Sequence, residues 1–236
     1  VVEVAREAAG TEALLLVGCG EQSTRATIEN CRNAAQAGGN YALVLPPFYF
    51  KGRMDERALL AHYRAVADAS PLPVLVYNMP LCTAGLDLDA ALICALAAHP
   101  NVVGLKDSAG NMARLAQIVA QAPASFAVFA GSAGYLLPAL AVGAAGAVAA
   151  LANIFPRQVC QVQELFERGR LDEARQLQGR LVAANTAVTT TYSVPGLKAA
   201  LEITAGYGGP PRMPLQPLMD VERQRLAAIL AEVVPL

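Results

Sequence analysis

Short apolar runs without polar alternation are the feature of this 236-residue chain that most constrains its fold. Strands that are buried on both faces have this pattern, and such strands form parallel sheets covered by helices. Helical patterns separate the runs, which follow one another at intervals of about 20 to 33 residues. The repeated order of strand and then helix predicts a right-handed parallel α/β array. The six predicted strands are Ala13–Val17, Tyr41–Leu45, Val74–Tyr77, Val102–Lys106, Ala127–Ala130 and Gly146–Ala150.

Two parallel architectures are compatible with this rhythm. A doubly wound sheet of six strands is one, although no run is followed by a Gly-x-Gly-x-x-Gly turn. The other is a (β/α)8 barrel that lacks its first two βα units in this chain, because the sequence opens on a helical pattern over Val1–Ala9. After Asn153 only helical patterns follow. The periodicity of the sequence alone therefore does not distinguish the doubly wound sheet from the truncated barrel.

Polar residues in front of the helical patterns mark where helices begin. Asp55, Asp87 and Asn111 stand where N-caps belong. Side-chain oxygens at such positions accept hydrogen bonds from the first free amides of a helix. We therefore predict that all three residues cap helices.

Composition and charge narrow the class of protein. Apolar residues make up 55% of the chain and charged residues 16%, so we expect surface to be hidden in an oligomer or inside a barrel. The net charge of −1 gives no electrostatic reason to expect a nucleic-acid or anionic-membrane partner. Residues 115–156 carry no charge, but prolines and glycines divide them into pieces too short to span a bilayer.

Five widely spaced cysteines, with no Cys-x-x-Cys pair, predict reduced thiols in an intracellular protein. The cysteines and only two histidines make a metal site an unfavoured reading of the sequence. The compartment, mitochondrial or cytoplasmic, depends on the start of the natural chain, which these residues do not fix.

A lysine ends one apolar run, and a tyrosine ends the run before it. In parallel folds, functional groups collect at the carboxyl ends of strands, and Lys106 and Tyr77 end consecutive predicted strands. Loss of hydration favours the uncharged form of an amine, which can attack a ketone and form a Schiff base. A neighbouring phenol can move the protons. The alternative is that Lys106 extends to solvent while Tyr77 covers the core, and spacing alone slightly favours it.

The segment "GSAG", residues 131–134, follows the next strand and opens a helix. Its amides and hydroxyl suit a carboxylate or a phosphate, but an ordinary turn between strand and helix reads the same way. We hold both readings open.

Taken together, four segments resemble a known family. "YNMP", "GLKDSAGN", "AGSAGYLLPALAVGAAGAV" and "ALAN", in this order, resemble the dihydrodipicolinate synthase/N-acetylneuraminate lyase family of class I aldolases. Within it, "YFKGRM", "TAGLDL", "GLKDS" and "YGGPPRMPLQ" are most similar to 4-hydroxy-2-oxoglutarate aldolases. The resemblance covers essentially the whole chain.

This resemblance implies a (β/α)8 barrel with C-terminal helices, assembled as a homotetramer of two tight dimers. Residues 1–155 would form the N-terminally truncated barrel, and residues 156–236 its last helix and the C-terminal helical region. The expected ligand is a small 2-oxo acid, with no cofactor, no metal, no nucleic acid and no membrane partner.

The resemblance also implies roles for individual residues. Lys106 matches the lysine that forms a Schiff base with pyruvate, and Tyr77 matches the proton-relay tyrosine. The remaining matches concern the substrate site: Gly131 and Ser132 line it, Val148 lies beside the pyruvate carboxylate, and Tyr49 reaches into the partner's site across the tight dimer.

Two departures from the family pattern matter. Cys82 stands about where the lysine-pathway synthases carry a carboxylate-binding arginine, which counts against dihydrodipicolinate synthesis. The first two strands, with the Gly-Ser/Thr-x-Gly-Glu loop, have no counterpart in this chain. Because a barrel without two strands exposes its edges, we expect roughly 60 or more residues of the natural protein to lie outside this chain, or the chain as it stands to be inactive.

The leading functional hypothesis is a Schiff-base aldolase that cleaves 4-hydroxy-2-oxoglutarate to pyruvate and glyoxylate. The alternatives are dihydrodipicolinate synthase or a 2-keto-3-deoxy sugar-acid aldolase of the same family. A third reading, from another class, is an inactive truncated homologue that serves in assembly or regulation.

Overall fold

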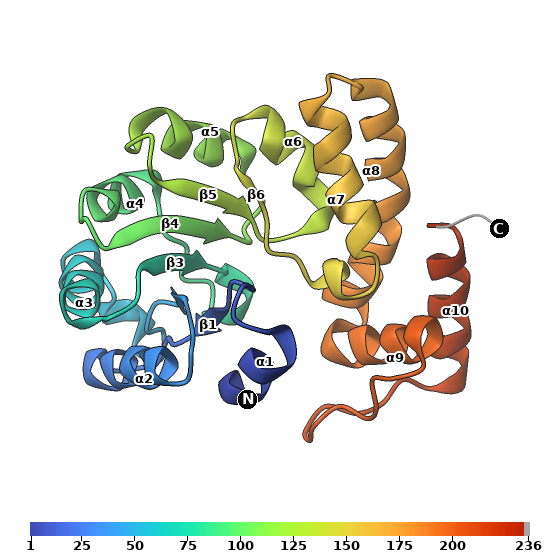
Figure 1. Cartoon of the computed structure of the whole chain (residues 1–236), viewed down its shortest axis with the longest axis horizontal. Coiled ribbons are helices and arrows are strands. Elements are labelled where there is room, and N and C mark those ends of the chain that lie inside the picture. Colours follow the sequence, from blue (N-terminus) through green and yellow to red (C-terminus); the bar gives the residue numbers. More distant parts are fainter. Residues whose placement is uncertain (234–236) are drawn as a thin grey trace. The chain divides into compact units, whose positions relative to one another are not determined.

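The strands form one six-stranded sheet in the structure, a computed structural model that describes residues 1–233 (Figure 1). Its strands lie in chain order, without the reversal that defines a doubly wound sheet. Parallel pairing joins the first four strands. The fold is therefore the half-barrel expected of a (β/α)8 barrel that lacks its first two βα units in this chain. The strands are β1 (Leu16–Gly18), β2 (Tyr41–Val44), β3 (Val74–Asn78), β4 (Val102–Asp107), β5 (Ala127–Ala130) and β6 (Gly146–Ala147).

The described chain divides into two compact units. The first comprises Val1–Phe129 with Val142–Ala144, and the second comprises Ala130–Ala141 with the residues from Ala145 onward. The domain boundary predicted after residue 155 stays a prediction. The last three residues of the second predicted domain, 234–236, lie outside the described part of the chain.

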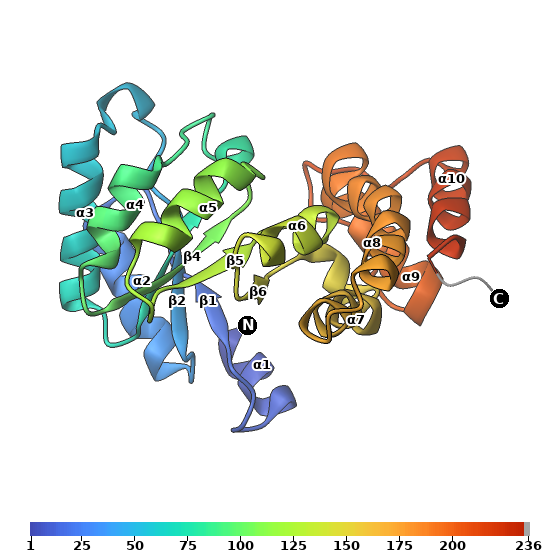
Figure 2. The same ribbon diagram turned by 90° about the horizontal axis from the view of Figure 1, so that it is seen from above.

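Helices of the first unit form an outer layer along its strands (Figure 1). Alternate strand residues, such as Val44 and Val76, are buried together with helix residues such as Ile93 and Ile118. In Figure 2, α1 projects from this unit, apart from the other four helices. The helices are α1 (Val2–Ala9), α2 (Thr24–Gln36), α3 (Glu56–Ala69), α4 (Ala90–Ala97) and α5 (Met112–Gln121).

Two of the three predicted helix caps are confirmed. Asp55 accepts a hydrogen bond from the Ala58 amide at the start of α3, and Asn111 accepts one from the Arg114 amide at the start of α5. The prediction for Asp87 is wrong. Asp89 caps α4, because its Oδ1 accepts from the Leu92 amide, whereas the carboxylate of Asp87 is bound by the side chains of Asn78 and Arg114.

The second unit has its own apolar core, built from helices and short 3₁₀ turns. Leu136, Leu151, Leu181 and Leu226 are almost completely buried in it. Burial of each such leucine contributes about 1.5–3 kcal/mol. Its helices are α6 (Leu136–Ala141), α7 (Pro156–Glu167), α8 (Leu171–Thr186), α9 (Ser193–Ala205) and α10 (Asp220–Ala231). Among residues 1–233, no helix combines the length and the apolar character needed to cross a bilayer.

Candidate active site

Lys106 and Tyr77 lie side by side at the ends of β4 and β3. They are direct partners in the register of the two strands, and both are half-buried. The Nζ atom of Lys106 lies 4.1 Å from the centre of the Tyr77 ring, a cation–π distance. The hydroxyl of Tyr77 donates a hydrogen bond to Met79 Sδ at 2.7 Å. The structure thus brings together an amine and a phenol, the two groups that the sequence suggested.

A β-bulge near the start of β4 sets this register. Val74 pairs with Val102, but Leu75 pairs with Gly104, so β4 carries one extra residue. A Cβ on Gly104 would lie 2.5 Å from the carbonyl oxygen of Ala127, so only glycine fits. Beyond the bulge, Lys106 shares a face with Tyr77, and its neighbour points to the helix-covered face.

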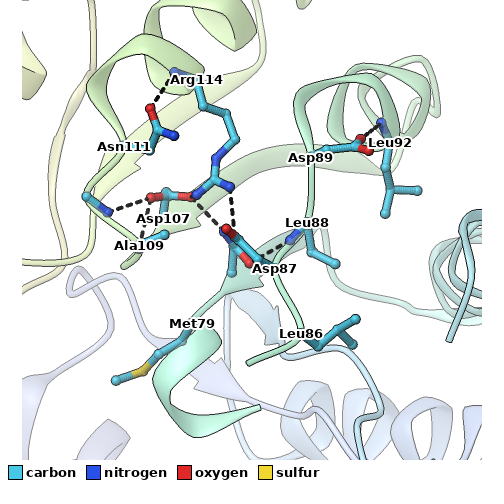
Figure 3. Close-up of polar contacts among 12 residues, drawn as sticks. Met79, Leu86, Asp87, Leu88, Asp89, Leu92, Asp107, Ala109, Asn111 and Arg114 are labelled. Carbon is cyan, nitrogen blue, oxygen red and sulfur yellow. Dashed lines mark hydrogen bonds and ion pairs between the residues drawn. The ribbon is translucent and has the colours of Figure 1, made fainter. Parts of the chain in front are cut away.

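A polar network lies on that helix-covered face (Figure 3). Asn78 Nδ2 donates to Asp87 Oδ1 and to Asp107 Oδ2, each at 2.8 Å. Arg114 joins the same two carboxylates, with Nη1 2.7 Å from Asp87 Oδ1 and Nη2 3.1 Å from Asp107 Oδ2. Asp107 Oδ1 also accepts from the backbone amides of Ala109, at 3.0 Å, and Gly110.

Burial and charge oppose each other at Asp87. Desolvation alone would raise the pKa of this carboxyl, but the hydrogen bonds from Arg114 and Asn78, with the guanidinium charge, outweigh it and lower that pKa. Sequence reasoning missed this network. The available signals were a polar Asn78 at the end of an apolar strand and a single arginine at the edge of a long uncharged stretch.

Ser108 was also assigned no role from the sequence. It stands two residues after Lys106, and its backbone amide donates to the Asn78 carbonyl at 2.8 Å. Its hydroxyl is buried and has no hydrogen-bond partner among the described residues. A buried hydroxyl in this condition retains the capacity to bind a polar ligand.

Tyr49 lies on an exposed loop of the same unit. Its side chain is 77% exposed, and its ring packs edge-to-face on Phe50 with a centroid distance of 5.0 Å. Gln22 Oε1 accepts from the Tyr49 amide at 2.9 Å and holds the loop. The aromatic side chain is therefore presented to the surroundings of the unit.

The other predicted binding residues belong to the second unit. Ser132 follows Gly131 and caps a short 3₁₀ turn, because its Oγ accepts from the Gly134 amide at 3.2 Å. The same oxygen accepts from Asn185 Nδ2 at 2.9 Å. With both bonds received, the Ser132 hydroxyl hydrogen is free to be donated to an acceptor such as a carboxylate. Sequence reasoning missed Asn185, because it lies on α8, far along the chain.

Val148 directly follows β6. Its amide donates to the carbonyl of Ala130 at 2.9 Å and so ties the ends of β5 and β6 together. No group of three or more His, Cys, Asp or Glu side chains gathers as a metal site within residues 1–233.

A parallel half-barrel with a lysine and a tyrosine paired at the ends of adjacent strands has the groups of a class I, Schiff-base aldolase. The model of the dihydrodipicolinate synthetase family matches residues 1–233. The chain belongs to this family and is a pyruvate-type class I aldolase, a carbon–carbon lyase.

Three known proteins illustrate the similarity. The chain is 45% identical to a probable mitochondrial 4-hydroxy-2-oxoglutarate aldolase of Emericella nidulans, over 94% of this chain and 72% of the relative. It is 38% identical to the L-threo-3-deoxy-hexylosonate aldolase of Hypocrea jecorina, over 95% of this chain and 73% of the relative. The E. coli K12 prophage protein YagE, solved in complex with pyruvate, superposes with a TM-score of 0.90 at 25% identity, over 98% of this chain and 79% of that protein.

Proposed function

We propose that this aldolase cleaves 4-hydroxy-2-oxoglutarate to pyruvate and glyoxylate. The observation that carries the proposal is the contact between Lys106 Nζ and the Tyr77 ring at 4.1 Å. It is supported by the 45% identity to the Emericella nidulans relative, whose name states that activity.

Lys106 is the proposed nucleophile. Its uncharged amine attacks the C2 ketone of the substrate, and loss of water leaves a protonated imine. A base removes the proton of the C4 hydroxyl, the C3–C4 bond breaks, and its electron pair moves into the imine. Glyoxylate leaves as the aldehyde, and an enamine remains on the lysine. Protonation at C3 and hydrolysis then release pyruvate and the free amine.

Tyr77 is the proposed proton carrier, since its hydroxyl belongs to the ring that the amine contacts. The protonated imine accepts the electrons of the breaking bond, so the proposed chemistry requires neither a metal ion nor an organic cofactor.

Substrate carboxylates are the proposed ligands of Ser132 and of the backbone at Gly131. The hydroxyl of Ser132 already accepts two hydrogen bonds and can donate its own. Val148 would supply an apolar wall beside pyruvate. We further propose a homotetramer made of two tight dimers, in which the exposed Tyr49 reaches the partner's site.

A second candidate substrate is a six-carbon 3-deoxy-2-oxo acid. The 38% identity to the Hypocrea jecorina aldolase favours it, and the same lysine chemistry would release pyruvate and a three-carbon aldehyde. Dihydrodipicolinate synthesis is disfavoured by Cys82, an exposed residue where the synthases that this chain resembles carry an arginine.

Borohydride trapping tests the proposal directly. The protein is incubated with pyruvate and borohydride, digested, and its peptides are weighed by mass spectrometry. We expect a stable adduct on Lys106, none on the chain's other two lysines, Lys51 and Lys198, and none in Lys106→Arg. A folded protein that gives no adduct on Lys106 contradicts the aldolase mechanism.

Product release distinguishes the two substrates. Glyoxylate formed from 4-hydroxy-2-oxoglutarate is compared with the three-carbon aldehyde formed from the deoxy-hexulosonic acid, under identical conditions. The proposal requires the larger kcat/KM for the first substrate.

A further inference from the structure

We propose that Arg114 is a positioning residue of this site: by bridging Asp87 and Asp107 behind the strand ends, it fixes the register that places Lys106 beside Tyr77. The inference rests on the proposed Schiff-base function, which it deepens. It concerns only residues of the first unit.

The network residues are the immediate chain neighbours of the reacting pair. Asn78 follows Tyr77 on β3, and Asp107 follows Lys106 on β4. Across the two strands, Tyr77 pairs with Lys106 and Asn78 pairs with Asp107. Because successive strand residues point to opposite faces, the network holds one face of these strand ends while the amine and the phenol occupy the other.

The register of β4 against β3 depends on contacts that hold one face of the strand. The bulge near Val103 already shifts the pairing of the two strands by one residue. A further slip of one residue would exchange the faces of Lys106 and Asp107 and remove the amine from Tyr77. Asn78 and Arg114 both bind the Asp107 carboxylate, and this is possible only when Asp107 faces the helices.

Burial of the Asp107 carboxylate makes the loss of either partner costly. The side chain of Asp107 is 1% exposed and that of Arg114 is 11% exposed, so water cannot replace a lost partner. Removing the cation or a hydrogen bond from a buried carboxylate carries a large free-energy cost. The register that satisfies Asp107 is therefore also the register that places the lysine.

Arginine is suited to this position for a geometric reason. Its two terminal nitrogens reach two different carboxylates, one from the segment before α4 and one from β4. A lysine carries the same charge at a single nitrogen, so it cannot reproduce the fork. The bridge thus joins β4, α5 and the segment that follows β3.

Arg114→Lys is the decisive variant. We expect a folded protein in which trapping of pyruvate on Lys106 is slowed roughly tenfold or more, since small displacements of a reacting group are costly. Two controls match it. Ile118→Val removes one core methyl a turn further along α5. Arg175→Lys makes the same substitution in an exposed ion pair with Asp172. Both should trap at the wild-type rate, within about twofold.

A second readout needs no substrate. Acetylation of Lys106 is measured against the two reference lysines, Lys51 and Lys198, in the same digest. We expect the relative rate at Lys106 to rise severalfold in Arg114→Lys, because the amine leaves its half-buried place on the ring, and to stay unchanged in both controls.

Each outcome decides the inference. Wild-type trapping and acetylation rates in folded Arg114→Lys overturn it, as does equal slowing by Ile118→Val at a comparable loss of stability. If Arg114→Lys does not fold, Asp87→Asn decides: this 45% exposed carboxylate supplies one arm of the bridge, and its loss should shift both readouts in the same direction. If the wild-type protein forms no adduct, the proposed function fails, and the acetylation ratio alone judges the positioning role.

Discussion

The hydroxyl of Tyr77 separates two steps of the proposed reaction. In Tyr77→Phe the ring beside Lys106 remains, and only the hydroxyl and its hydrogen bond to Met79 are lost. We expect kcat to fall by about 10²–10⁴ while pyruvate is still trapped on Lys106, because general acid–base catalysis contributes about that much. Steady-state cleavage and borohydride trapping measure the two effects. Loss of trapping in parallel with kcat would assign the tyrosine a structural role instead.

His62 predicts how stability depends on pH. Burial lowers the pKa of this imidazole to about 4, while Nδ1 lies 3.0 Å from Thr24 Oγ1. The unfolded chain binds the proton at the ordinary pKa of about 6.5. Between these values the unfolded state holds more protons, so stability falls as the pH falls from 6.5 to 4, by about 3 kcal/mol in total.

Denaturant unfolding at several pH values measures this slope, and His62→Gln should flatten it. An equal slope in wild type and variant would mean that other groups govern stability in this range.

At the scale of elements, Asp89 accounts for the start of α4. Its Oδ1 accepts from the Leu92 amide at 2.8 Å. Asp89→Ala should lower the free energy of unfolding by about 1 kcal/mol, the usual contribution of an N-cap. Asp172→Ala, in an exposed ion pair, should cost no more than about 0.5 kcal/mol. Equal losses in both variants would contradict the capping assignment.

The strands were largely predictable from the apolar pattern, because a strand that is buried on both faces has a continuous run of apolar residues. The strands around Val74 and Val102 and the caps Asp55 and Asn111 were found in this way. The cap predicted at Asp87 was harder: two aspartates stand two residues apart, and only the path of the chain before α4 decides that Asp89 caps the helix while Asp87 binds Arg114.

The site was less predictable than the strands. Strand ends placed Lys106 and Tyr77 on neighbouring strands, but the bulge that makes them partners is marked in the sequence only by Gly104. Contacts such as Arg114 with Asp107, or Asn185 with Ser132, join residues whose meeting depends on how whole elements pack.

At the scale of the whole molecule, the chain matches about three quarters of the length of its relatives, 72% and 73% for the two aldolases. Within the first unit, β1 pairs with a single neighbour, β2. The exposures of Leu14 and Leu16, 69% and 38%, follow from that edge position. These leucines help to line an apolar hollow on the face away from the helices, together with Tyr41, Leu75 and Phe129.

This hollow should bind apolar molecules in the 236-residue chain. Exposed contiguous apolar surface is a binding or association site. We expect the neutral dye Nile red to bind it, and Leu14→Gln with Leu16→Gln to weaken that binding roughly fivefold, for a loss of about 1 kcal/mol of apolar contact. Dye titration measures the affinity, and Leu171→Gln, a 49% exposed leucine of the second unit, is the control. Because both hollow leucines are partly exposed already, the melting temperature should hardly change. Unchanged dye affinity in the double variant would mean that the face is closed in solution, so that a second copy of the chain or another segment covers β1.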